Sequence, residues 1–141
     1  MERSEVRWAL LGERRPIVLL SGDEQTELRA MQIVAPATAE QKRGFVVLPG
    51  DEAAESRLLQ QAIGSAGPGS GIGGIGIEVE IGIRDGLPHD GVVRLALPHH
   101  SQIFCTWLVT LTRDHLIERA GVLSRAKLEQ LTNALRLARI E

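Results

Sequence analysis

Short apolar runs, separated by glycine, proline or clustered charges, follow one another along most of the chain and predict β-strands. Residues 16–21 form a nearly unbroken apolar run, which is the pattern of a strand buried on both faces. In residues 77–82, isoleucine and valine alternate with glutamate and glycine, as in a strand with one buried face. Strands are therefore predicted at residues 5–11, 16–21, 31–37, 45–48, 77–81, 92–97 and 103–111.

Two segments have the spacing of amphipathic helices instead. Residues 51–63 are predicted to form a helix capped by Asp51, and Ser124 is predicted to cap a C-terminal helix. Residues 112–116 predict a single capped helical turn. Seven of the thirteen residues in 64–76 are glycine, which predicts a flexible loop. The C-terminal helix carries an apolar stripe made of Leu128, Leu131, Leu135 and Ala138.

Composition narrows the class of protein. The chain has 141 residues, of which 43% are hydrophobic and 24% charged, as in one soluble globular domain. A formal net charge of −2 excludes a polycationic protein, so any nucleic-acid site has to be a local basic patch.

A single cysteine, Cys105, excludes an internal disulfide and a thiolate metal cluster and favours a reducing compartment. The N-terminus leads into no apolar run of the kind a signal peptide needs, and residues 95–112 are too polar for a spanning helix. We therefore expect a cytoplasmic protein with no membrane contact.

Three patterns resemble cofactor, acid–base or metal sites, but each has a simpler structural interpretation. Residues 69–74 match G-x-G-x-x-G, yet a helix is predicted before them and a strand after, the reverse of a dinucleotide site. Glu78 and Glu80 share one strand face, which favours a solvated face over an acid–base pair. His99 and His100 point to opposite faces of an extended strand, so they cannot chelate one ion together. We expect neither a metal nor a cofactor.

The sequence Glu13-Arg14-Arg15-Pro16 is a sharper signal, because two arginines directly precede a predicted buried strand. A guanidinium group presents a planar fork of donors and stays charged, so it suits a phosphodiester. A chance pair of surface arginines remains the competing interpretation.

Taken together, three segments resemble the MazF/PemK/Kid family of toxins from toxin–antitoxin pairs. Glu5-Val6-Arg7-Trp8 with residues 15–21 is similar to the family's opening strand and its Arg-Pro-apolar-Ser strand, and residues 33–38 are similar to its strand ending in a catalytic threonine. The third segment matches in its order of strand, single turn, short strand and capped helix, and comprises residues 87–93, 111–116 and 119–137.

The resemblance covers approximately residues 5–49 and 77–141, and it implies one toxin domain over residues 1–141 with an insertion at approximately 50–76. The implied fold class is α+β, mainly β: an SH3-like antiparallel β-barrel with a C-terminal amphipathic helix and a helical, glycine-rich insertion. The implied protein is a homodimer that cleaves single-stranded RNA without a metal and is held inactive by a cognate antitoxin protein.

By this resemblance Arg15 and Thr38 match the family's two main catalytic positions, and Arg14, Ser21 and Glu13 are candidate substrate contacts. RNA cleavage through the 2′-hydroxyl leaves a 2′,3′-cyclic phosphate and a 5′-hydroxyl. Fixed donors such as Arg15 and the Thr38 hydroxyl can stabilise the charge that builds on the phosphoryl oxygens. The general base stays unassigned, with Glu13 near in sequence.

Two departures keep other functions open. The loop before Arg15 is short, and Trp107 and Val109 precede Thr110 where relatives often have a glutamine and a basic residue. One alternative is a non-catalytic toxin of the same fold that acts by protein binding, like the CcdB gyrase inhibitors. The other is a degenerate, inactive member that binds only its antitoxin.

Overall fold

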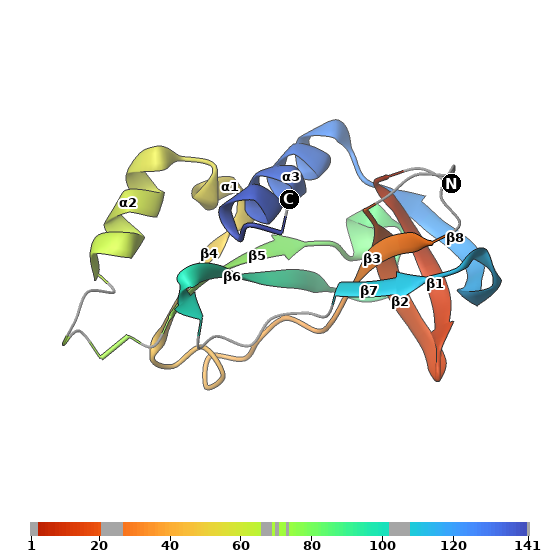
Figure 1. The fold of residues 1–141 in the computed structure, drawn as a ribbon, viewed down its shortest axis with the longest axis horizontal. Helices are drawn as coiled ribbons and strands as arrows, with labels where there is room; N and C mark the ends of the chain where they lie inside the picture. The colour runs from red at the N-terminus through yellow and green to blue at the C-terminus, as the bar shows by residue number, and fades with distance from the viewer. Residues whose placement is uncertain are drawn as a thin grey trace. The chain divides into compact units, whose positions relative to one another are not determined.

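Eight strands and three α-helices make up most of the described chain in the computed structural model (Figure 1). The structure describes residues 3–20, 27–65, 69, 71–72, 74–101 and 108–140. The strands are β1 (Glu5–Leu11), β2 (Glu13–Leu19), β3 (Leu28–Gln32), β4 (Phe45–Pro49), β5 (Gly74–Glu80), β6 (Val92–Ser101), β7 (Leu108–Leu111) and β8 (Leu116–Val122). The helices are α1 (Gly50–Ala53), α2 (Ser56–Ser65) and α3 (Arg125–Leu137), with 3₁₀ turns η1 (Ile83–Asp85) and η2 (Arg113–His115).

The chain forms two compact units that alternate along the sequence. The first unit comprises Met1–Ala35, Ile81–Val93 and Thr106–Arg125. The second unit comprises Pro36–Glu80, Arg94–Cys105 and Ala126–Glu141.

A five-stranded sheet in the order β7-β3-β2-β1-β8 forms the first unit, and each pair of neighbouring strands in it is antiparallel. The β1–β2 hairpin is tight: Leu11 pairs with Glu13, and Gly12 between them has φ +80°. That left-handed conformation strongly favours glycine. The hairpin therefore brings the arginines at the start of β2 to one exposed end of the sheet, opposite the last residues of β1.

Alternate positions on neighbouring strands build the core of this sheet. Val18, between two core residues of β2, is also 0% exposed, so the end of β2 is buried on both faces, as its unbroken apolar run predicts. The core cluster consists of Ala9, Ile17, Leu19, Leu28, Ala30 and Leu111.

A three-stranded sheet in the order β4-β5-β6 organises the second unit, and β4 and β5 pair in parallel. A parallel pair requires a crossover connection, because the chain must return to the same end of the sheet before the second strand starts. Helices α1 and α2 lie within that connection. The segment that the sequence marks as an insertion is therefore what allows β5 to run beside β4.

The start of α1 is packed against both α3 and β5. A Cβ placed on Gly50 would lie 2.9 Å from Gln130 Oε1 and 3.3 Å from Val79 Cγ2. The Nδ2 amide of Asn133 donates to the carbonyl of Ala53 at 3.4 Å. In α3 the residues Leu131, Ala134 and Leu135 are buried, which confirms the predicted amphipathic helix.

The predicted class, α+β and mainly β with a C-terminal helix, is confirmed. The described strands lie in two sheets and form no closed barrel. The turn predicted at residues 112–116 is η2, with Thr112 at its N-cap position. None of the described helices combines the length and apolar character needed to cross a membrane.

The helix predicted over residues 51–63 is wrong in its start and its continuity. Pro49, in an extended conformation, occupies the N-cap position of α1, so Asp51 lies inside the first turn. After Ala53 the chain leaves the α-helix, and the N–H of Glu55 donates to the carbonyl of Glu52. Helix α2 then starts at Ser56. Two short helices replace the one predicted.

Several strand boundaries also differ from the prediction. Strand β2 spans Glu13–Leu19 and not 16–21, so Arg14 and Arg15 lie inside the strand and not before it. Strand β6 continues past residue 97 to Ser101.

Strand β3 starts at Leu28, where Leu28 and Ala30 are core residues, and ends at Gln32, so most of the predicted range of 31–37 lies outside it. Strand β5 starts at Gly74, inside the glycine-rich segment, where Gly74 pairs with Phe45 of β4. Only residues 108–111 of the strand predicted at 103–111 are described, as β7.

Two backbones meet without intervening side chains where η1 packs on β8. A Cβ on Gly121 would lie 2.1 Å from the carbonyl oxygen of Asp85, and a Cβ on Gly86 would lie 2.1 Å from that of Ala120. Gly86 also has φ +105°. Both glycines are therefore required for this contact, Gly86 by conformation as well as by space.

We expect Gly121→Ala to lower the free energy of unfolding by about 2 kcal/mol or more, because the added methyl group overlaps backbone atoms. Gly64→Ala is the matched control: Gly64 lies in α2 with no atom within 4 Å of its notional Cβ, so alanine should raise stability by about 0.5–1 kcal/mol. Urea unfolding of both variants measures the difference. Equal stability of the two variants would contradict the close contact.

Candidate functional site

The two arginines at the start of β2 point to opposite faces of the first unit's sheet, as neighbours on a strand must. Glu13 and Arg15 share one face, and Arg15 Nη2 lies 2.7 Å from Glu13 Oε1. The Arg15 side chain is 42% exposed and that of Glu13 is 70% exposed. This ion pair is therefore open to solvent and available for exchange with another anion.

On the other face, three neighbouring strands contribute one cluster. Trp8 of β1 is paired in register with Glu118 of β8, and Arg14 of β2 lies over the Trp8 ring with its guanidinium carbon 4.6 Å from the ring centroid. Arg14 also forms an ion pair with Glu118. The His89 ring meets the Trp8 ring edge to face, with centroids 6.3 Å apart. An indole face and a guanidinium group are thus held together near solvent.

Thr38 belongs to the second unit and starts the turn between β3 and β4. Its Oγ1 accepts the N–H of Gln41 at 3.1 Å, and Gln41 Oε1 accepts the N–H of Thr38 at 2.9 Å. The N–H of Lys42 donates to the Thr38 carbonyl at 3.1 Å. This reciprocal pattern is a capping box, and it fixes Thr38 through its backbone and its side chain. The hydroxyl hydrogen is not used in the bond from Gln41.

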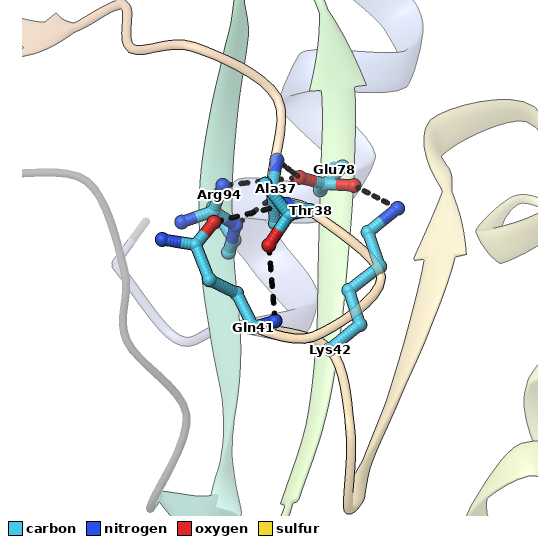
Figure 2. A network of polar contacts seen from close by, with 6 residues as sticks. All are labelled: Ala37, Thr38, Gln41, Lys42, Glu78 and Arg94. Carbon is cyan, nitrogen blue, oxygen red and sulfur yellow. Dashed lines mark hydrogen bonds and ion pairs between the residues drawn. The ribbon is translucent and has the colours of Figure 1, made fainter.

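Glu78 of β5 connects this turn to the sheet (Figure 2). Its Oε2 accepts the N–H of Ala37 at 3.4 Å and lies 3.2 Å from Arg94 Nε and 3.1 Å from Arg94 Nη2. Its Oε1 lies 3.1 Å from Lys42 Nζ. Arg94 is on β6, the strand next to β5 in the sheet. The turn, β5 and β6 therefore meet at one carboxylate.

The charges in this network are largely shielded from water. The Glu78 side chain is 11% exposed and that of Arg94 is 5% exposed, whereas Lys42 is 40% exposed. Burial by itself raises the pKa of Glu78, but the hydrogen bonds and charge of Lys42, the N–H of Ala37 and the hydrogen bond from Arg94 outweigh it. The pKa of Glu78 is lowered overall, and the carboxylate stays ionised at neutral pH.

The prediction of a solvated glutamate face is correct for Glu80, which is exposed, and wrong for Glu78. Arg94 was not predicted as a site residue, although the sequence carries a signal for it. A charged residue inside the apolar run of residues 92–97 needs a buried partner, since unpaired charges are almost never buried. The capping box of Thr38 and Gln41 was readable as T-x-x-Q in the same way.

Several sequence predictions lie outside what the structure describes. Ser21 is one of them, as are the side chains of His99, His100, Cys105 and Trp107. Within the described residues, no group of three or more metal-ligating side chains occurs. The glycine motif at 69–74 does have a helix, α2, before it and a strand, β5, at its end, the reverse of a dinucleotide site.

Comparisons with known proteins place the fold. No family model matches the sequence, and no curated protein matches it. Among solved structures, an endoribonuclease in complex with its cognate antitoxin from a mycobacterial species is 14% identical with a TM-score of 0.53, over 99% of this chain and 92% of that chain. The Mycobacterium tuberculosis toxin MazF-mt6 is 14% identical with a TM-score of 0.55, over 96% of each chain.

A third structure, an endoribonuclease from a mycobacterial species, is 14% identical with a TM-score of 0.52, over 99% of this chain and 90% of that chain. All three matches span nearly the whole of both chains. The structure therefore has the fold of the MazF toxins, and the resemblance read from the sequence is confirmed at the level of the fold.

The lowered pKa of Glu78 predicts a specific pH dependence of stability. A folded-state pKa below that of the unfolded chain, about 4.3 for glutamate, means that ionised Glu78 stabilises the fold above that pH. The stabilisation is lost as the pH falls through the lowered pKa. We expect Glu78→Gln to be less stable than the parent by about 2 kcal/mol near neutral pH, and the gap to narrow in acid.

Urea unfolding of both proteins between about pH 6 and about pH 3 measures the gap. Glu80→Gln is the control, because Glu80 is exposed on the same strand and should leave stability unchanged at either pH. A gap of constant size across this range would contradict an ionised, hydrogen-bonded Glu78.

Proposed function

We propose that residues 1–141 form the toxin of a toxin–antitoxin pair, an endoribonuclease that cleaves single-stranded RNA. The observation that carries the proposal is the fold: solved structures named as a MazF toxin and as endoribonucleases match nearly the entire chain. Since folds host many functions, the residues must carry the chemistry. Arg15 and Thr38, the two residues matched by the sequence resemblance, supply donors of the required kind.

The proposed reaction is attack of the ribose 2′-oxygen on the adjacent phosphorus. A new O–P bond forms, the bond from phosphorus to the 5′-oxygen breaks, and the products are a 2′,3′-cyclic phosphate and a 5′-hydroxyl. The 2′-hydroxyl loses its proton, and the departing 5′-oxygen gains one. No metal is needed if fixed donors stabilise the extra charge on the non-bridging oxygens.

In this mechanism Arg15 and Thr38 are catalytic. Arg15 presents a charged, planar fork of N–H donors to the phosphoryl oxygens. Its exposed ion pair with Glu13 contributes about 1 kcal/mol or less, so exchanging Glu13 for a phosphate oxygen costs little. The Thr38 hydroxyl donates its hydrogen while its oxygen still accepts from Gln41. The general base is left unassigned.

Binding of the RNA strand is assigned to Arg14, Ser21 and Glu13, the candidate substrate contacts that the sequence resemblance implies. Arg14 contributes charge from its place over Trp8, and Ser21 contributes a hydroxyl. Glu13 accepts hydrogen bonds from sugar or base donors once Arg15 is engaged. The partners proposed are the RNA, a second copy of the chain in a homodimer, and a cognate antitoxin; one of the matched structures is in complex with its cognate antitoxin.

We expect the purified protein to cut a long single-stranded RNA at discrete positions in the presence of EDTA and to leave 5′-hydroxyl ends. Arg15→Ala and Thr38→Ala should each slow cleavage by about 100-fold or more, because each removes a donor to the developing charge. Thr38→Ser should retain most of the activity, since the hydroxyl is kept. Arg15→Lys should be intermediate, since the charge is kept and the fork is lost.

Arg136→Ala is the control, because it removes an exposed arginine of α3 that has no place in the proposed site. Circular dichroism and size exclusion verify that each variant is folded. Intact RNA after incubation with the folded parent protein would refute the nuclease. It would favour the toxin that acts by protein binding, with gyrase as the next partner to test.

A further inference from the structure

The residues on either side of Thr38 are held by the same carboxylate. Ala37, directly before Thr38, donates its N–H to Glu78 Oε2, and Lys42, at the far end of the capped turn, contacts Glu78 Oε1. Thr38 is linked to Gln41 and Lys42 through hydrogen bonds of the turn. Glu78 therefore clamps both ends of the short segment that presents the Thr38 hydroxyl (Figure 2).

The clamp is rigid because Glu78 is itself fixed. Two nitrogens of the Arg94 guanidinium group meet Oε2, and the Arg94 side chain is 5% exposed. Two donors from a buried arginine fix the position of Oε2, and the contact of Lys42 Nζ with Oε1 limits the rotation of the carboxylate. Strands β5 and β6 are neighbours in one sheet, so the clamp rests on regular secondary structure and not on a loop.

Both Glu78 oxygens are engaged by donors, so this carboxylate is poorly placed to remove a proton from a substrate. Its effect on chemistry has to pass through the group that it orients. Displacement of a catalytic donor by about 1 Å is enough to slow a reaction substantially, since the donor must meet the charge where it develops.

We infer that Glu78 is a positioning residue that sets the Thr38 hydroxyl for transition-state stabilisation in RNA cleavage. The inference rests on the proposed function, and it adds a residue that the family resemblance did not mark. Arg94 and Lys42 act on Thr38 indirectly, because they keep the Glu78 carboxylate charged and in place.

A double-mutant cycle tests this inference. Single-turnover cleavage of an RNA oligonucleotide is measured with the full chain and with Glu78→Gln, Thr38→Ala and the double variant. Glu78→Gln should lower the cleavage rate by about 10-fold and leave the concentration for half-saturation nearly unchanged, because it misplaces a donor and removes no RNA contact. In the Thr38→Ala background, Glu78→Gln should have no further effect.

Two variants separate positioning from general damage. Glu80→Gln removes an exposed carboxylate from the same strand and should cleave like the parent. Lys42→Gln releases one end of the clamp at a half-exposed position and should slow cleavage by a few-fold, again only when Thr38 is present. If Glu78→Gln fails to fold, the same cycle is measured with Lys42→Gln in its place.

The possible results separate failure of the positioning role of Glu78 from failure of the proposed nuclease function. A parent protein that leaves the oligonucleotide intact refutes the proposed nuclease. Cleavage by the parent with additive losses in the double variant overturns the positioning role alone. If Glu78→Gln changed only the RNA concentration for half-saturation, the positioning role would also be overturned, because Glu78 would then affect RNA binding and not the cleavage step. Loss of the effect in the Thr38→Ala background supports it.

Discussion

The carboxylate of Glu78 is largely shielded from water, and the second unit depends on the hydrogen bonds and ion pairs that this carboxylate makes. Removing a carboxylate from water is costly, and in this protein the cost is offset by two cations and one backbone N–H. Breaking such a pair by removing one partner is destabilising, because the other charge is left uncompensated. Strand β5, strand β6 and the turn after Ala37 therefore share one electrostatic constraint.

The arginines of the β1–β2 hairpin are under the opposite constraint. Arg14 and Arg15 are both close to half exposed, and each has a glutamate partner that is even more exposed. Such pairs contribute little to stability, so their partners can be exchanged for a ligand at small cost. The same two residue types, arginine and glutamate, thus form a fixed structural contact at Glu78–Arg94 and an exchangeable one at Glu13–Arg15. Burial makes the difference.

This contrast also explains what could be predicted from the sequence. Alternation in residues 77–81 predicted the strand and its buried face, because side-chain period is a property of the segment itself. It could not reveal the environment of Glu78, since the carboxylate is buried by Ala37, Lys42 and Arg94. Those residues lie far from Glu78 along the chain, and a local pattern does not record them.

The helical segment shows the same limit at the level of backbone. Spacing predicted one helix over 51–63, but α1 starts at Gly50, which packs against Gln130 and Val79, and ends at Ala53 before α2 starts at Ser56. The glycine count predicted a flexible loop, yet Gly74 and Gly76 are buried strand residues paired with β4. Tertiary packing overrides local propensity at both places.

The local charge around Thr38 is compatible with the proposed anionic substrate, although the net charge of the chain is −2. Lys42 and Arg94 oppose the single carboxylate of Glu78, and the exposed Glu40 and Arg43 of the same turn offset each other. The network therefore carries an excess of one positive charge. Long-range attraction depends on such local fields rather than on the sum over the chain. Glu78 therefore holds the turn without leaving a net negative charge beside it, because Lys42 and Arg94 together outweigh its carboxylate.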